Sequence, residues 1–126
     1  MIKGIETVLL FSSDAKKLAA FYRNDVGLKQ TYEAEMGDAN LFGFEWKGSA
    51  SLSIMDHSEV RGKNKTPERF MVNFEVDDIE KELKRLRRAK VRIITGPYHI
   101  EEYGLVATLE DPDGNYFQFV QTRPVK

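Results

Sequence analysis

Short runs of alternating apolar and polar residues recur along the chain, and this alternation is typical of β-strands with two unlike faces. In the run 116–121, Phe117 and Phe119 share one face, whereas Tyr116 and Gln118 share the other. We therefore expect each strand to have one dry face, packed in a core, and one mixed face. The pattern predicts eight strands, at residues 5–11, 29–35, 41–47, 49–56, 70–76, 91–94, 102–109 and 116–121.

Two helices are predicted by their apolar spacing and their capping residues. The first is expected at residues 15–24, after an N-cap at Ser13 or Asp14, and Gly27 should end it. The second follows an N-cap at Asp78 and carries its apolar residues on one face. The dry faces of the strands should pack under these two helices.

The order strand, helix and three strands occurs twice, so the sequence contains an internal repeat of about half its length. Asp14 and Asp78 hold the same place in the two halves. This order predicts an α+β fold of two βαβββ modules, with paired sheets and the helices outside. We expect a single domain, residues 1–126, built of repeats at about 1–57 and 69–123 and joined by a charged linker at 58–68.

Composition and charge argue against several classes of protein. The chain has 126 residues, a net charge of −1 and no cysteine, so neither a strong general attraction to nucleic acid nor a disulfide framework is expected. The basic residues between positions 81 and 92 fit the solvated side of an amphipathic helix, which argues against a nucleic-acid surface. No apolar run is typical of a signal peptide or a membrane span, and we expect a cytoplasmic protein.

The mixed faces have an unusual composition. They carry more Met, Leu and Tyr than a sheet surface that faces water normally does. One interpretation is a solvated side of an antiparallel sheet. The other, which the composition favours, is a concave cavity that is apolar with a few polar groups, as in small-molecule sites.

Two motifs resemble those of a known family. The helix end Phe21–Tyr22 before Val26–Leu28, the turn Asp111–Asn115 and the repeated module are similar to the vicinal oxygen chelate superfamily. That superfamily includes glyoxalase I, fosfomycin and bleomycin resistance proteins and extradiol dioxygenases. The resemblance covers nearly the whole chain. It implies a cupped mixed sheet, and in the enzymes a divalent metal held by residues of the first, fourth, fifth and last strands. It also implies a homodimer.

The resemblance places the four metal-ligand positions at Thr7, Ser53, Met71 and Gln118. All four fall on mixed faces. Divalent metals in such sites take imidazole nitrogens and carboxylate oxygens, whereas these residues offer two hydroxyls, a thioether and an amide. The sequence therefore predicts no metal and no other cofactor.

Other residues are candidates to bind a ligand. Glu75 is either a group exposed at the rim or the partner of a cationic ligand, and it is also the candidate base of a metal-free isomerase. Asn73 and Gln118 either bind a polar ligand group together or form a structural pair. Several residues of the mixed faces and of the loops near them would suit an aromatic ligand. The remaining candidates are Trp46, Met55, Tyr98, Tyr103 and Tyr116.

The sequence thus predicts a metal-free protein that binds a small molecule, aromatic or cationic, in the cup, similar to bleomycin resistance proteins. The alternative is a divergent lyase or dioxygenase of the glyoxalase type. In that case His57 or His99 would belong to a displaced metal site.

Overall fold

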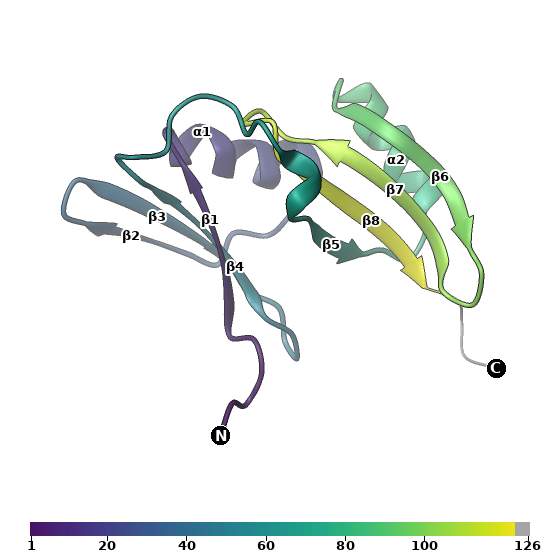
Figure 1. Cartoon of the computed structure of the whole chain (residues 1–126), viewed down its shortest axis with the longest axis horizontal. Coiled ribbons are helices and arrows are strands. Elements are labelled where there is room, and N and C mark those ends of the chain that lie inside the picture. Colours follow the sequence, from purple (N-terminus) through teal and green to yellow (C-terminus); the bar gives the residue numbers. More distant parts are fainter. Residues whose placement is uncertain (123–126) are drawn as a thin grey trace. The chain divides into compact units, whose positions relative to one another are not determined.

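Two four-stranded mixed sheets with the same strand order form the part of the chain that the structure describes, residues 1–122 of a computed structural model (Figure 1). The chain divides into two units, one at Met1–Gly62 and one that begins at Lys63. Each unit consists of a strand, a helix and three further strands, so the predicted βαβββ repeat is confirmed. Residue 123, the last of the expected second repeat, lies outside the described residues.

The first unit contains one sheet in the order β1-β4-β3-β2. Strand β1 runs parallel to β4, and the other neighbouring pairs are antiparallel. The helix leads from β1 across to the remaining strands, as a parallel pair requires. The elements are β1 (Thr7–Ser12), α1 (Ala15–Ala20), its π-helical continuation η1 (Phe21–Val26), β2 (Tyr32–Met36), β3 (Ala39–Phe44) and β4 (Ser51–Asp56).

The second unit repeats this plan in the order β5-β8-β7-β6. Strand β5 runs parallel to β8, and the remaining pairs are antiparallel. The elements are a 3-10 turn η2 (Pro67–Arg69), β5 (Val72–Glu75), α2 (Ile79–Arg88), β6 (Arg92–Ile100), β7 (Gly104–Glu110) and β8 (Tyr116–Thr122).

Each unit has its core between the helix and one face of the sheet. In the first unit, Leu18 of α1 is fully buried together with Phe44 and Ile54. In the second unit, the core contains Leu83 of α2 and Phe117 of β8. The dry faces predicted from alternation therefore do pack under the helices.

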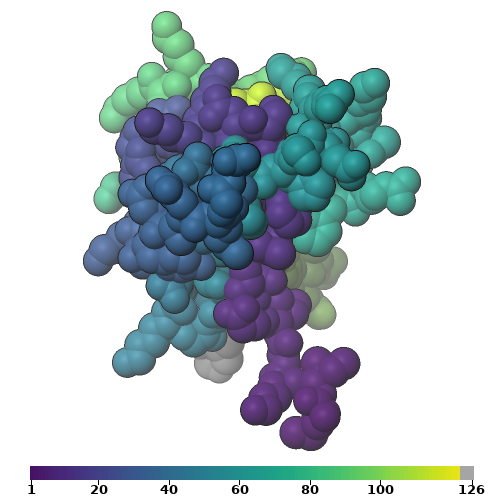
Figure 2. All heavy atoms as spheres, turned by 90° about the vertical axis from the view of Figure 1, so that its left-hand side faces the viewer, coloured from purple at the N-terminus to yellow at the C-terminus, as the bar shows by residue number. Residues whose placement is uncertain are grey.

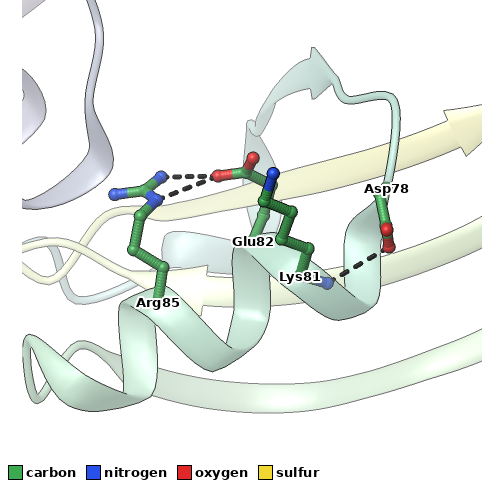
Figure 3. A network of polar contacts seen from close by, with 4 residues as sticks. All are labelled: Asp78, Lys81, Glu82 and Arg85. Carbon is green, nitrogen blue, oxygen red and sulfur yellow. Dashed lines mark hydrogen bonds and ion pairs between the residues drawn. The ribbon is translucent and has the colours of Figure 1, made fainter.

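Matching hydrogen bonds begin both helices. The Asp14 carboxylate accepts from the Lys17 backbone N–H at 3.1 Å, and the Asp78 carboxylate accepts from that of Lys81 at 3.2 Å (Figure 3). Figure 3 also shows the ion pair of Glu82 with Arg85, 2.7 Å, one turn further along α2. The N-cap predictions are confirmed, with Asp14 rather than Ser13 at the cap.

The last strand of each repeat supplies a second cap. Asp56 of β4 accepts from the N–H of Ala15, the first residue of α1, at 2.8 Å. Gln121 of β8 accepts from the N–H of Ile79, the first residue of α2, also at 2.8 Å. Helix N-termini leave N–H groups without an intrahelical partner, and these bonds therefore attach each helix to the last strand of its own repeat.

A glycine ends the first helix, as predicted. Gly27 has a φ of 94°, and its N–H and that of Leu28 both donate to the Tyr22 carbonyl. The left-handed backbone at this position explains why glycine suits it.

Several strand boundaries differ from the prediction. Strand β2 begins at Tyr32 rather than 29, β3 ends at Phe44 rather than 47, and β5 begins after Met71. Strand β6 differs most, because it extends to Ile100 instead of ending at residue 94. Its pairing shifts twice around Pro97, which has no N–H to donate, and an edge strand tolerates proline at such irregularities.

Part of the predicted linker is attached to the second unit. The Asn64 backbone N–H donates to the Asp113 carbonyl at 2.8 Å, and its side-chain amide donates to Asn115 at 3.0 Å. The single-domain organisation with a linker at 58–68 stays a prediction. None of the helices in residues 1–122 is long and apolar enough to cross a membrane.

The N-terminal residues carry exposed apolar side chains. Met1, Ile2 and Ile5 are all exposed. Figure 2 shows this purple segment projecting from the first unit. These residues are therefore no part of the first unit's core.

We expect Asp14→Ala and Asp78→Ala each to lower the free energy of unfolding by about 1 kcal/mol, because each removes an N-cap hydrogen bond. Urea denaturation followed by circular dichroism measures this. Asp77→Ala removes the neighbouring exposed carboxylate and is the control. An equal loss of stability for Asp77→Ala would contradict the capping role of Asp78.

Candidate functional site

One face of each sheet has no helix of its own unit on it, and we call it the helix-free face. In the first sheet, the strand register identifies the residues of this face, because residues paired across neighbouring strands point to the same side. Its twelve strand residues carry no charged side chain. They are Thr7, Leu9, Phe11, Tyr32, Ala34, Met36, Ala39, Leu41, Gly43, Ser51, Ser53 and Met55.

Hydroxyl groups on this face pair with one another. The Thr7 and Ser51 hydroxyl oxygens lie 2.9 Å apart, and the Tyr32 hydroxyl lies 3.3 Å from that of Ser53. Ser53 is only 2% exposed. Apolar side chains surround these groups, and Leu9 is 52% exposed. A mostly apolar surface with a few placed hydroxyls is typical of small-molecule sites.

The helix-free face of the second sheet is more polar. The Gln118 amide donates to the Thr108 hydroxyl at 2.9 Å, and the Thr122 hydroxyl donates to Glu75 at 2.8 Å. Asn73 lies opposite Gln118 in the β5–β8 register, so both belong to this face. Gln118 therefore has a structural partner, which is Thr108 rather than Asn73.

The remaining candidate residues lie at different places. Met55 is on the helix-free face of the first sheet, and Tyr116 is on that of the second. Trp46 lies in the β3–β4 connection, beyond the end of β3 on which we expected it. Tyr98 lies within β6 and Tyr103 in the β6–β7 turn. Both tyrosines are exposed.

The two histidines occupy separate units. His57 accepts a hydrogen bond at Nδ1 from the Glu59 backbone N–H, and its ring meets Phe11 edge to face at 5.2 Å between centroids. His99 is an exposed residue of β6. Among residues 1–122, no three His, Cys, Asp or Glu side chains are grouped so that they could hold a metal ion.

Asp56, the last residue of the inner strand β4, connects three elements of the first unit. Beyond the bond from Ala15, its carboxylate accepts from the Asn40 backbone N–H at 2.9 Å and from the Asn40 side-chain amide at 3.3 Å. Burial raises the pKa of Asp56, but the bonds from Ala15 and Asn40 outweigh it, so the pKa lies below the usual carboxyl value. The charged form thus holds β4, β3 and α1 together.

The sequence prediction missed Tyr32. Its ring lies so close to Gly43 that a β-carbon there would collide with the ring atoms Cδ1, Cε1 and Cζ. The spacing of Tyr32, Ala34 and Met36 in a predicted strand was the available signal. It did not identify Gly43 as the partner, because the partner depends on the β2–β3 register.

Comparison with known families places this geometry in context. The family model described as Glyoxalase/Bleomycin resistance protein/Dioxygenase superfamily matches residues 4–119. The chain belongs to this superfamily. The predicted resemblance and the α+β fold class are therefore confirmed.

Solved structures with the same fold have different activities. An antibiotic-binding protein from Streptomyces sp. CB03234 is 22% identical, with 97% of this chain and 98% of that chain covered and a TM-score of 0.75. The trypanothione-dependent glyoxalase I of Leishmania major is 18% identical, with 95% and 87% covered and a TM-score of 0.75. The fosfomycin resistance protein of Listeria monocytogenes is 16% identical, with 98% and 96% covered and a TM-score of 0.74. A comparison with curated proteins found no match. At these identities the likeness shows the fold alone.

The metal of the superfamily's enzymes does not fit the residues present. Thr7, Ser53 and Gln118 each already share a hydrogen bond with a neighbouring side chain. Met71, just before β5, offers only a thioether. Neutral hydroxyls, an amide and a thioether bring no charge to balance a divalent cation, and hard divalent cations prefer oxygen anions or imidazole. These four side chains therefore support no chemical step that runs through a bound metal.

We expect Asp56→Asn to lower the free energy of unfolding by about 1–3 kcal/mol at neutral pH, because the bonds are to a charged acceptor. In the wild type this contribution is complete above the unfolded-state pKa of about 4. It is lost as the pH falls through the lower folded-state pKa, since the unfolded chain then binds the proton first.

The difference in stability between wild type and Asp56→Asn should therefore shrink below about pH 4. Urea titrations between neutral and acid pH measure it. Asp38→Asn, at an exposed turn, keeps all three bonds of Asp56 and is the control. A difference that stays constant down to the acid end would show that the Asp56 charge does not carry the stability.

Proposed function

We propose that this protein binds a small organic molecule, without a bound metal, on the helix-free faces of its sheets. One feature carries the proposal: at the four positions where the resemblance places the metal ligands, this chain has the neutral residues Thr7, Ser53, Met71 and Gln118. The surrounding surface keeps the features of a ligand site, since it is apolar with a few hydroxyl and amide groups. Members of the fold that bind or resist antibiotics support a binding role.

The helix-free face of each unit offers its own chemistry to a ligand. On the first sheet, a ligand would meet the hydroxyls of Thr7 and Ser53 and the polarisable side chain of Met55. On the second sheet, a ligand would meet Asn73, Gln118 and the ring of Tyr116, and the exposed Glu75 would suit a cationic group. Trp46, Tyr98 and Tyr103 would add aromatic contacts from connections and the edge strand.

Metal analysis separates this proposal from a metal-dependent enzyme. After dialysis we expect below about one Zn, Ni, Mn or Fe ion per ten chains, because the donor set lacks anionic and imidazole ligands. Inductively coupled plasma mass spectrometry measures it, and a metal-containing glyoxalase I carried through the same steps is the positive control. A stoichiometric ion would favour the alternative, a lyase or dioxygenase with a displaced site at His57 or His99.

Ligand binding should appear as thermal stabilisation. A ligand at about 100 times its Kd stabilises by roughly 2.7 kcal/mol, so a thermal-shift screen of antibiotics and aromatic or cationic metabolites should give clear increases in Tm. Trp46→Ala should reduce the increase caused by an aromatic hit. Phe70→Ala removes an exposed aromatic ring outside both helix-free faces and is the control. A broad screen without any hit would count against a binding function.

We further propose that two copies associate, as the superfamily resemblance implies. Sedimentation velocity at micromolar concentration should then give the mass of about two chains. Monomer throughout that range would refute the dimer. Residence in the cytoplasm stays a prediction.

A further inference from the structure

The side chain of Tyr32 crosses the first sheet from its edge. Tyr32 belongs to the edge strand β2, and Gly43 is its register partner on β3. Its hydroxyl reaches Ser53 on β4, the register partner of Gly43, at 3.3 Å. A side chain that spans three strands in one row must lie along the sheet rather than stand away from it.

Gly43 makes room for this arrangement. Any β-carbon at this position would collide with three atoms of the Tyr32 ring. The absence of a side chain therefore lets the ring lie against the β3 backbone. Tyr32 remains 42% exposed, so the ring is supported from the sheet side and accessible from the other.

Apolar side chains border the exposed side of the ring. Leu9 continues the row beyond Ser53, and it is 52% exposed. Leu41 and Met55 are register partners in the next row, together with Phe11 of β1. An aromatic ring held flat and bordered by apolar groups is suited to stack against another flat ring.

The charged side chains near this face determine which kinds of planar ligand it suits. None of the twelve strand residues on this face is charged, and Glu33 and Glu35 of β2 alternate to the opposite face. Glu6, just before β1, brings a carboxylate to one end of this face, where it accepts from the Thr7 hydroxyl at 2.6 Å. An anionic ligand would therefore lose hydration here and meet a charge of its own sign. The second sheet differs, because Glu75, Glu110 and Arg92 lie on its helix-free face or at its edge.

We infer that the helix-free face of the first sheet binds planar aromatic molecules that carry no negative charge, and that Tyr32 is the residue on which the ligand stacks. In a neighbouring row the Thr7 hydroxyl donates to the Glu6 carboxylate, so its oxygen can accept a hydrogen bond from Ser51 or from a ligand. This inference rests on the proposed binding function and names its ligand class.

Four naphthalene probes of one size test the ligand class. They are neutral 2-naphthol, anionic naphthalene-2-sulfonate, cationic 2-naphthylmethylammonium and the saturated decahydro-2-naphthol. Isothermal titration calorimetry at neutral pH gives each Kd on the full-length protein. We expect 2-naphthol and the cationic probe each to bind at least about tenfold more tightly than the other two, since the sulfonate meets the Glu6 carboxylate and the saturated probe lacks a flat ring.

Three variants test the role of Tyr32. Tyr32→Ala should weaken 2-naphthol binding about tenfold, whereas Tyr32→Phe keeps the ring and should stay within about threefold. Gly43→Ala should weaken binding as Tyr32→Ala does, because the new methyl group displaces the ring without removing it. Gly43 has no left-handed backbone, so alanine fits its conformation. Phe70→Ala is the control and should bind like the wild type.

The outcomes separate this inference from the proposed function. Binding of the anionic or the saturated probe as tight as that of 2-naphthol overturns the ligand class. Unchanged binding in a folded Tyr32→Ala protein overturns the role of Tyr32. If no naphthalene binds but the broad screen yields another ligand, the inference fails and the binding function stands. If neither experiment yields a ligand, both fail.

Discussion

A single helix can cover only one face of a four-stranded sheet, and this constraint shapes both units of the protein. The helix lies between the two parallel strands of its unit, so it packs on the same side of the sheet in each repeat. Core side chains such as Phe44 and Phe117 gather on that side. The other face then carries residues that the core does not need. The amino acids on that face can therefore suit ligand binding rather than the stability of the core.

Each helix begins with two capping bonds, and one of them attaches the helix to its sheet. Asp14 and Asp78 each accept from an N–H group three residues ahead in the chain. Asp56 and Gln121 accept from the first helical N–H group and belong to the last strand of each repeat, so they close each βαβββ module on itself. This second bond uses a carboxylate in the first module and an amide in the second, so only in the first does it depend on a charge.

The protein combines an established fold with a changed set of side chains. The superfamily match covers residues 4–119. The positions to which the resemblance assigns the metal ligands carry neutral side chains in this chain. Three of them, Thr7, Ser53 and Gln118, share hydrogen bonds with neighbours on the same sheet. A hydroxyl or amide that is satisfied in this way stabilises the face and leaves it nearly uncharged. Such a surface suits an organic ligand better than an ion.

The sequence by itself determined the repeat, the helix caps and the identity of each strand's dry face, because these depend on local periodicity and on short-range hydrogen bonds. The resemblance to the superfamily places the enzymes' four metal-ligand positions at Thr7, Ser53, Met71 and Gln118. Only the tertiary structure decided that β6 continues past Pro97, that Gln118 pairs with Thr108, and that Tyr32 lies across Gly43 to reach Ser53. These facts depend on strand register. A register joins residues far apart in the chain, and no local pattern of polarity specifies it uniquely.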